Sequence, residues 1–305
     1  FRVFSYSLSP VPRVPEQVPP HPPERGSSCS SRRIRSITGI VRVKTSMKKS
    51  IDTLLHEIVT FFEENQNPEI VKKYSRFFRE GYDAYGIDKD LLPRQQKIWT
   101  GRYAETLGLE GFCDLGDRLV RVGKYEPVIL AVLFLVPFRE SFSLGTCSRV
   151  GAWLDEGITN WAQTDVLCQQ ILSPMLSDSV IDIPDLIPWR EASSRWKRRA
   201  VPVTLLALKS QTDQYPSMFD GISPLMTDPE RVVNQGVGWL LREMWKVDPS
   251  QVEPFLRSWK ETAPRLIFQY ATEKMYPEKR LEFRRSRKGK NERGLFFTRD
   301  PAPDT

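Results

Sequence analysis

Three short segments of this chain each place a tryptophan three or four residues before a charged side chain. The pairs are Trp161 with Asp165, Trp196 with Arg199, and Trp239 with Arg242. Residues three or four apart are neighbours on a helix surface, so each pair would set an aromatic plane beside a charge. A groove lined in this way suits a ligand with both cationic and phosphate character, and damaged DNA has both.

Each of these residues also has an ordinary structural interpretation when it is taken singly. Tryptophan is highly buried on average, so each of the three is compatible with the core. Asp165 is compatible with a surface or capping group. Arg199 and Arg242 are compatible with ordinary ion pairs, for which Glu191 and Glu243 are the nearby candidates.

The positive charge of the chain is concentrated near its two ends. The formal net charge is +7 over 305 residues. Residues 1–46 hold eight Lys/Arg and two Glu, and residues 279–290 hold seven Lys/Arg and one Glu. The section between them is therefore net negative, so any basic surface on the folded body has to be local.

Composition argues against several kinds of site. The four cysteines form no C-x-x-C pair, which disfavours a disulfide framework and a zinc site and favours a reducing compartment. Only two histidines occur, so a Ser-His-Asp triad, a Cys-His dyad and a histidine-ligated metal are disfavoured. We therefore expect no metal and no cofactor. The longest apolar run, Val128 to Val136, is about half of a membrane span, so we expect a buried core helix and no membrane segment.

Residues 1–46 differ in composition from the rest of the chain. Seven prolines fall within the first 25 positions, and Ser-rich and Arg-rich stretches follow. We expect disorder there, because such a segment buries too little apolar area to offset chain entropy. An organellar transit peptide has a similar composition. Met47-Lys48-Lys49-Ser50 looks like a natural start, which favours an upstream extension of a bacterial-type frame and a cytoplasmic, nucleoid-associated protein.

Residues 47–278 carry helical periodicity. Ser50 is an expected N-cap for an apolar stripe from Ile51 to Phe62, and Asn67-Pro68-Glu69 is expected to open a second helix. Further helical segments are expected at 90–107, 110–122, 125–139, 145–157, 160–175, 188–198, 199–211, 228–246 and 249–274. Strand signals are sparse, so we predict an all-α array of helix pairs.

The three tryptophan segments are 35 and 43 residues apart, close to the roughly 40-residue period of HEAT-type repeats. Stacked helix pairs of this kind would curve into an α-solenoid with a concave surface. Residues 279–305 are predicted to be a basic tail, either a solvated, disordered end or an electrostatic tether to nucleic acid.

Four motifs in order resemble those of the AlkD-like DNA glycosylases of the DNA alkylation repair family. They are Asn67-Pro68-Glu69 … Lys73-Tyr74 … Gly86-Ile87, then Asn160-Trp161-x-x-x-Asp165, Trp196-x-x-Arg199-Ala200, and Gly238-Trp239-x-Leu241-Arg242-Glu243. The resemblance covers about residues 50–275.

The resemblance implies a monomeric solenoid of HEAT-like repeats that holds duplex DNA in its concave face. It implies hydrolysis of the N-glycosidic bond of cationic N3- and N7-alkylpurines, with the lesion left stacked, so no deep cavity is expected. Carried over position by position, Asp165 is similar to the catalytic carboxylate, and Trp161 and Trp239 to the aromatic walls. The expected DNA contacts are Arg199, Arg242, Tyr74 and Trp196.

The stretch 228–233 departs from the family pattern because it lacks an aromatic pair that some relatives carry there; Arg231 is a candidate extra phosphate contact. Two alternatives stay open. The chain could be a non-catalytic HEAT-like protein that binds branched or damaged DNA, or a protein–protein scaffold in which the tryptophan faces are buried between repeats.

Overall fold

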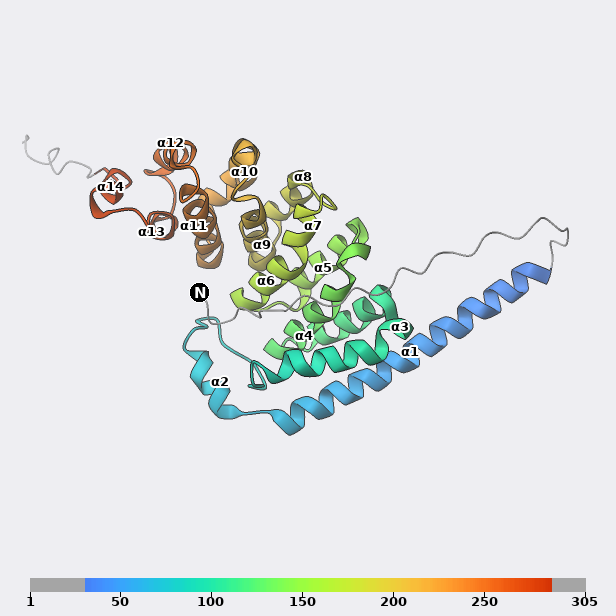
Figure 1. Ribbon diagram of the computed structural model, residues 1–305. Helices are drawn as coiled ribbons and strands as arrows, with labels where there is room; N and C mark the ends of the chain where they lie inside the picture. Colours follow the sequence, from blue (N-terminus) through green and yellow to red (C-terminus); the bar gives the residue numbers. More distant parts are fainter. Residues whose placement is uncertain (1–30, 287–305) are drawn as a thin grey trace, which may run out of the picture.

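The computed structural model describes the backbone of residues 31–286 and the side chains from residue 45 onward. All regular secondary structure in this part of the chain is helical, which confirms the predicted all-α class (Figure 1). The main helices are α1 (Ser31–Asn65), α2 (Pro68–Ser75), α3 (Leu91–Arg121), α4 (Tyr125–Leu135), α5 (Leu144–Glu156), α6 (Trp161–Leu167), α7 (Ser173–Ser177), α8 (Ile183–Leu186), α9 (Arg195–Leu205), α10 (Tyr215–Ile222), α11 (Arg231–Trp245), α12 (Pro249–Trp259), α13 (Arg265–Ala271) and α14 (Pro277–Glu282).

Short helical segments of other geometry link several of these helices. They are η1 (Val136–Ser141), η2 (Cys168–Leu172), η3 (Ile187–Glu191), η4 (Leu206–Leu208), η5 (Thr212–Gln214) and η6 (Ser223–Thr227).

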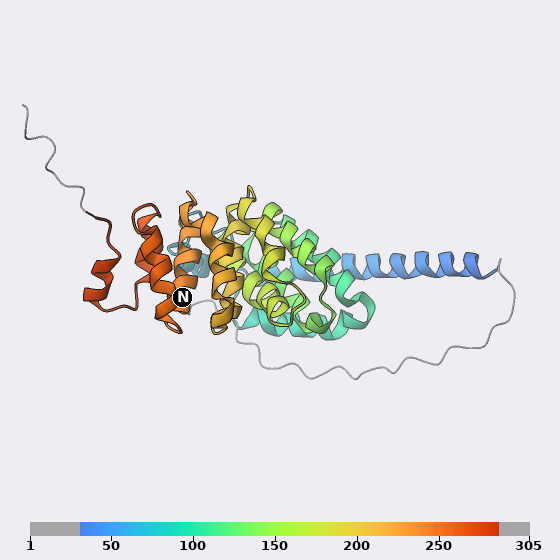
Figure 2. The same ribbon diagram turned by 90° about the horizontal axis from the view of Figure 1, so that it is seen from above.

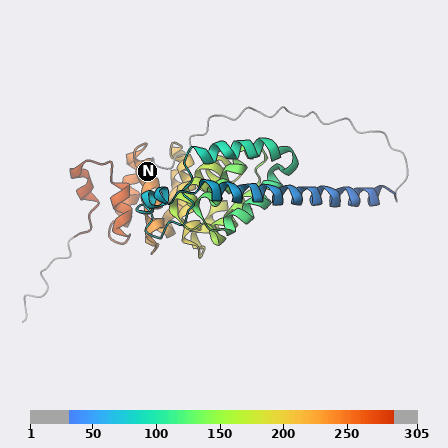
Figure 3. The same ribbon diagram turned by 90° about the horizontal axis from the view of Figure 1, so that it is seen from below.

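Helix α1 begins earlier than expected. Disorder was expected through residue 46, whereas the helix starts at Ser31 and extends well beyond the body of the molecule (Figures 2 and 3). Residues 31–46 contain no proline, unlike the first 25 positions, so nothing in their sequence interrupts the backbone hydrogen bonds of a helix. The predicted apolar stripe is confirmed, because Ile51 and Phe62 at its two ends are both buried.

Helix α2 starts as predicted. The Asn67 side chain accepts hydrogen bonds from the backbone N–H groups of Glu69 and Ile70, and Pro68 occupies the first turn, where its missing N–H costs nothing. The chain returns to this cap at Gly86, whose φ is 78° and where an added Cβ would lie 2.2 Å from the Asn67 carbonyl oxygen. This close approach explains the glycine of the Gly86-Ile87 motif.

The helices from α4 to α13 form two rows (Figure 1). One row, called here the inner row, consists of α4, α6, α9, α11 and α13, and each of these packs against the next. The other, the outer row, contains α5, α7, α8, α10 and α12. Helix α4 is buried along its whole length, as expected for the apolar run from Val128. Among the described residues, no helix is long and apolar enough to cross a bilayer.

Several helix boundaries differ from the sequence prediction in this region. The segment expected as one helix at 249–274 is divided into α12 and α13. The expected break between residues 198 and 199 is wrong, because α9 is continuous and is capped by Ser194, whose side chain accepts from the Lys197 N–H. Trp196 and Arg199 therefore share one helix. Helix α10 was not predicted, since it is only eight residues long and has Pro216 in its first turn.

The C-terminal end of the fold lies beyond the expected boundary at 278. Helix α14 spans this boundary, and Phe283 just after the helix is fully buried. The Lys279 ammonium pairs with the carboxylates of Glu253 and Glu282 at 2.7 and 3.3 Å. The stretch was predicted to be a tail because it is basic. Its aromatic residue, Phe283, packs under the Arg257 guanidinium of α12, whose carbon lies 5.7 Å from the ring centroid. The rest of the expected tail, residues 287–305, lies outside the described residues.

Candidate active site

Helix α6 positions Asp165. The Asn160 side chain caps the helix by accepting from the backbone N–H groups of Ala162 and Gln163, so Trp161 is the first helical residue. Asp165 follows one turn later and is buried, with 6% of the residue exposed. The interpretation of Asp165 as a plain surface group is therefore wrong.

The partner of Asp165 is Arg199 of α9. The Arg199 Nε and Nη2 donate to the two carboxylate oxygens of Asp165, each at 2.9 Å, and Nη1 donates to the Val232 carbonyl at 2.6 Å. One guanidinium thus joins α6, α9 and α11, three successive helices of the inner row. Helices α9 and α11 lie close together at Gly236, where an added Cβ would lie 3.3 Å from Pro202 Cγ and 3.5 Å from Arg199 Cγ.

Burial determines what this pair can do. Arg199 is 1% exposed, so the expected contact of Arg199 with the DNA backbone does not fit the geometry, and its partner is Asp165 rather than Glu191. Burial raises the pKa of the Asp165 carboxyl, and the charge and hydrogen bonds of Arg199 oppose that rise. The bidentate pair fixes the orientation of the carboxylate.

Trp161 is half-buried and is held by the segment that follows α2. Its indole Nε1 donates to the Phe77 carbonyl at 3.3 Å. Its ring stacks on Phe78, with centroids 5.4 Å apart and an interplanar angle of 18°, and Phe78 in turn stacks on Tyr82. Tyr74, the expected DNA-facing tyrosine, is half-buried in α2, and the Lys73 ammonium lies 5.6 Å from its ring centroid.

Trp239 and Arg242 lie on one face of α11. Trp239 is half-buried, whereas Arg242 is 9% exposed. The Arg242 guanidinium donates to Glu243 at 3.0 Å, which confirms that predicted partner, and to Glu273 at 2.5 Å. A phosphate contact by Arg242 would therefore compete with two carboxylates.

Trp196 does not fit the expected DNA contact, because it is 6% exposed. The Arg195 guanidinium carbon lies 4.9 Å from the Trp196 ring centroid and covers it. Among the predicted residues, the structure thus brings Trp161, Asp165 and Arg199 together on α6 and α9. The convergence of the Trp161 and Trp239 planes on Asp165 stays a prediction.

Sequence reasoning missed the residue that fixes the Gly86-Ile87 motif. The Glu126 carboxylate is buried and accepts from the backbone N–H groups of Tyr85, Gly86 and Ile87 at 2.8, 2.7 and 3.1 Å. A carboxylate beside the apolar run of α4 was the available signal, because a buried charge requires such partners.

The cysteines offer no nucleophile in the described part of the chain. Cys113, Cys147 and Cys168 are free thiols and all are buried. Burial raises the pKa of the Cys113 thiol to about 12 and that of Cys147 to about 11, so both stay protonated at neutral pH. No group of three or more His, Cys, Asp or Glu in the described residues could hold a metal ion.

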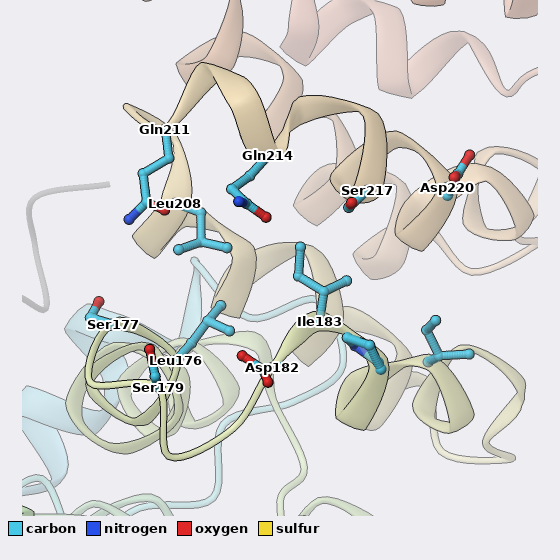
Figure 4. Close-up of a pocket in the computed structure, with 12 residues that line it drawn as sticks. Leu176, Ser177, Ser179, Asp182, Ile183, Leu208, Gln211, Gln214, Ser217 and Asp220 are labelled. Carbon is cyan, nitrogen blue, oxygen red and sulfur yellow. The ribbon is translucent and has the colours of Figure 1, made fainter.

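A pocket of about 520 Å³ lies on the outer row, between the α7–α8 connection and the segment from η4 to α10 (Figure 4). Leu176, Ile183 and Leu208 are its buried apolar lining, and polar side chains such as Asp182 and Gln214 surround them. None of the predicted site residues lines it.

Comparisons with known proteins agree with the resemblance of the motifs. The structure is similar to that of a predicted DNA alkylation repair enzyme from Enterococcus faecalis, with a TM-score of 0.55 and 17% identity. The match covers 70% of this chain and 98% of that chain, and it concerns the fold. No curated protein gives a match. The family described as DNA alkylation repair enzyme matches residues 58–275, more than half of the sequence, and the chain therefore belongs to that family.

Proposed function

We propose that this protein is a monofunctional DNA glycosylase that hydrolyses the N-glycosidic bond of N3- and N7-alkylpurines in duplex DNA. Membership of the family supports action on alkylated DNA. The observation that carries the proposal is Asp165, a buried carboxylate held in one orientation by Arg199 and placed one helical turn from Trp161.

The chemistry requires little acid catalysis. An alkylated purine carries positive charge and is already a good leaving group, so the bond to the sugar breaks with positive charge developing on C1′. A fixed carboxylate stabilises that charge and orients the attacking water. Arg199 binds each oxygen of Asp165 once, and a carboxylate has about four lone-pair sites, so acceptor capacity is left for the substrate.

The aromatic residues complete the scheme. An indole face attracts a cation by about 0.5–2 kcal/mol, depending on desolvation. Trp161 and Trp239 are both half-buried, so part of each side chain is accessible on the inner row. In this proposal the inner row forms the concave face of a HEAT-like solenoid, and duplex DNA lies along it. Arg199 is a positioning residue that acts through Asp165.

One observation favours the alternative of a DNA-binding protein without chemistry. The ion pair of Asp165 and Arg199 joins three helices, as a purely structural pair would. Such a protein would bind duplex or branched DNA with a strong salt dependence and would leave methylated bases in place. Burial of Trp196 is what a protein–protein scaffold would also show.

The deciding experiment measures release of 7-methylguanine and 3-methyladenine from methylated duplex DNA. We expect release by the wild type and at least about ten-fold slower release by Asp165→Asn, about 1.4 kcal/mol in barrier height. The matched control is Asp178→Asn, which breaks the bidentate pair of Asp178 with Arg139 on the outer side. That control should match the wild type.

Two results would end the proposal. Absence of base release by the wild type excludes the glycosylase. Equal rates for Asp165→Asn and the wild type remove Asp165 from catalysis. Rates are compared at a temperature where circular dichroism shows both variants folded, so that loss of the ion pair is not mistaken for loss of chemistry.

A further inference from the structure

Most cations on the inner row are neutralised by carboxylates of the fold. The guanidinium of Arg198 pairs with Asp228, the Lys197 ammonium with Asp155, and Arg195 with Glu230. Because the section between the basic ends is net negative, the inner row by itself offers little positive charge to a phosphate backbone.

Helix α2 and the turns after it carry exposed cations that differ from the neutralised cations of α9. Lys72, Arg76 and Arg79 are exposed, and none has a carboxylate within ion-pair distance among the residues that the structure describes. We call these three residues the basic strip. Lys72 and Arg76 are four residues apart on continuous helical backbone, since the φ and ψ of Arg76 are −59° and −18°, so they share a face.

The basic strip is attached to the candidate active site. Between Arg76 and Arg79 lie Phe77, whose carbonyl accepts from the Trp161 indole, and Phe78, whose ring stacks on it. The Arg76 guanidinium carbon lies 4.9 Å from the exposed Phe77 ring. The three cations are thus held at a fixed place relative to Trp161.

We propose that the basic strip binds the phosphodiester backbone of duplex DNA beside the lesion and adds positive charge next to the inner row, most of whose own cations are neutralised. The proposal rests on the function proposed above for the site and names the element that engages the DNA. Arginine forks bind phosphate oxygens in pairs, and the lysine adds a point charge. The strip contacts no base, so it binds damaged and undamaged duplex alike.

The test uses the full chain and an undamaged duplex, with binding measured by fluorescence anisotropy across a range of salt concentrations. In the triple variant Lys72→Gln, Arg76→Gln, Arg79→Gln, the slope of log K against log salt should fall by about three, since each phosphate contact contributes about 0.9. Affinity at about 0.1 M salt should fall at least about ten-fold.

The matched control removes three charges from the outer side of the array: Arg139→Gln, Arg190→Gln, Lys209→Gln. These residues belong to η1, to η3 and to the turn after η4, and the control should keep the wild-type slope. Since the substituted residues are exposed or half-exposed, both triple variants should fold.

An unchanged slope in the strip variant overturns the proposal, and so does an equal loss of slope in the control. The outcome is separable from that of the glycosylase test. Loss of salt-dependent binding without base release by the wild type supports the strip and rejects the enzyme. Base release with an unchanged slope supports the enzyme and rejects the strip.

Discussion

Two arginines of this protein join neighbouring helices through aspartates, one inside the fold and one near its surface. Arg199 binds Asp165 and a backbone carbonyl, with side-chain exposures of 1% and 8% for the pair. Arg149 of α5 binds Asp114 and Asp117 of α3, and its exposure is 26%. Asp117 also accepts from the indole Nε1 of Trp153 at 2.7 Å.

The degree of burial determines how rigidly each arginine holds its aspartate partner. Near the surface, water screens the charges and one guanidinium faces more than one carboxylate, so the cluster tolerates small movements. Inside the fold, a single carboxylate faces a single guanidinium. If either side chain moved away, the other would remain buried as an unpaired charge. A carboxylate fixed in that way is suited to a site where charge develops, whereas the surface cluster is suited to holding α3 against α5.

The largest expected effect is that of Arg199→Met. It leaves the Asp165 carboxylate buried without its cation, so the free energy of unfolding should fall by about 3–5 kcal/mol. Urea denaturation measures this loss. Adding Asp165→Leu should recover most of it, because an apolar pair of similar volume carries no desolvation penalty. A loss below about 1 kcal/mol in the single variant would mean that the pair is not isolated from water.

Arg149→Met is expected to have a smaller effect on stability and none on catalysis. It removes charged hydrogen bonds that are partly solvated, so unfolding should become easier by about 2 kcal/mol. Base release per folded molecule should match the wild type. A slower rate at equal folded fraction would show that the α3–α5 cluster influences the site.

Trp239→Ala should slow base release by up to about thirty-fold, since loss of one cation–π wall removes about 0.5–2 kcal/mol of transition-state stabilisation. Affinity for undamaged duplex should change less than the rate. Single-turnover release and anisotropy binding, measured on the same preparation, separate the two. If affinity falls as much as the rate, Trp239 binds DNA without contributing to the chemical step.

The pH dependence of stability should have opposite signs at the two clusters. Burial alone would raise the pKa of Asp117, but the hydrogen bonds from Arg149 and Trp153 outweigh it and lower the pKa. Its stabilisation is present above the unfolded pKa, near about 3.9, and is lost as the pH falls through the folded pKa.

The Asp165 pKa is raised, so its contribution to stability is greatest below the unfolded pKa and is lost as the pH rises through the folded pKa. Asp117→Asn should therefore flatten the acid side of the stability profile by less than about 1 kcal/mol, because exposure weakens the pair. Asp165→Asn should remove a loss of stability that accompanies rising pH, the opposite of the Asp117 effect. Urea denaturation of both variants at pH values from about 3 to 7 measures the two effects. If both substitutions change the pH dependence of the free energy of unfolding in the same direction, the pKa of Asp165 is not raised.

Local patterns predicted much of the fold. The start of α2 at Asn67 and the apolar run of α4 depend on neighbouring residues, so spacing was sufficient to find them. The expected cap at Ser50 is wrong, because Ser50 lies inside α1. The continuity of α9 was not predictable in this way. Its residues 198 and 199 are both arginines, and only tertiary contacts decide that Arg198 is half-buried against Asp228 while Arg199 is fully buried against Asp165.

The sequence identified residues of the candidate site, but it did not show which of them form ion pairs with one another. Asp165 and Arg199 are 34 residues apart, and sequence distance does not tell which of several carboxylates a guanidinium meets. Glu243 was found because it adjoins Arg242 in the chain, whereas Glu273 lies on another helix. The role of Phe78 in holding Trp161 depends on a contact across 83 positions, which no local pattern reports.

The three N–H donors that converge on Glu126 have a mechanical consequence. They tie the loop after α2 to the first turn of α4, and the Tyr125 N–H adds a bond to the Asp83 carbonyl at 2.8 Å. A displacement of that loop would break several buried polar contacts at once. The loop after α2 therefore cannot act as a hinge without breaking these bonds. A force applied to α2, for example by a bound duplex, would be transmitted to α4.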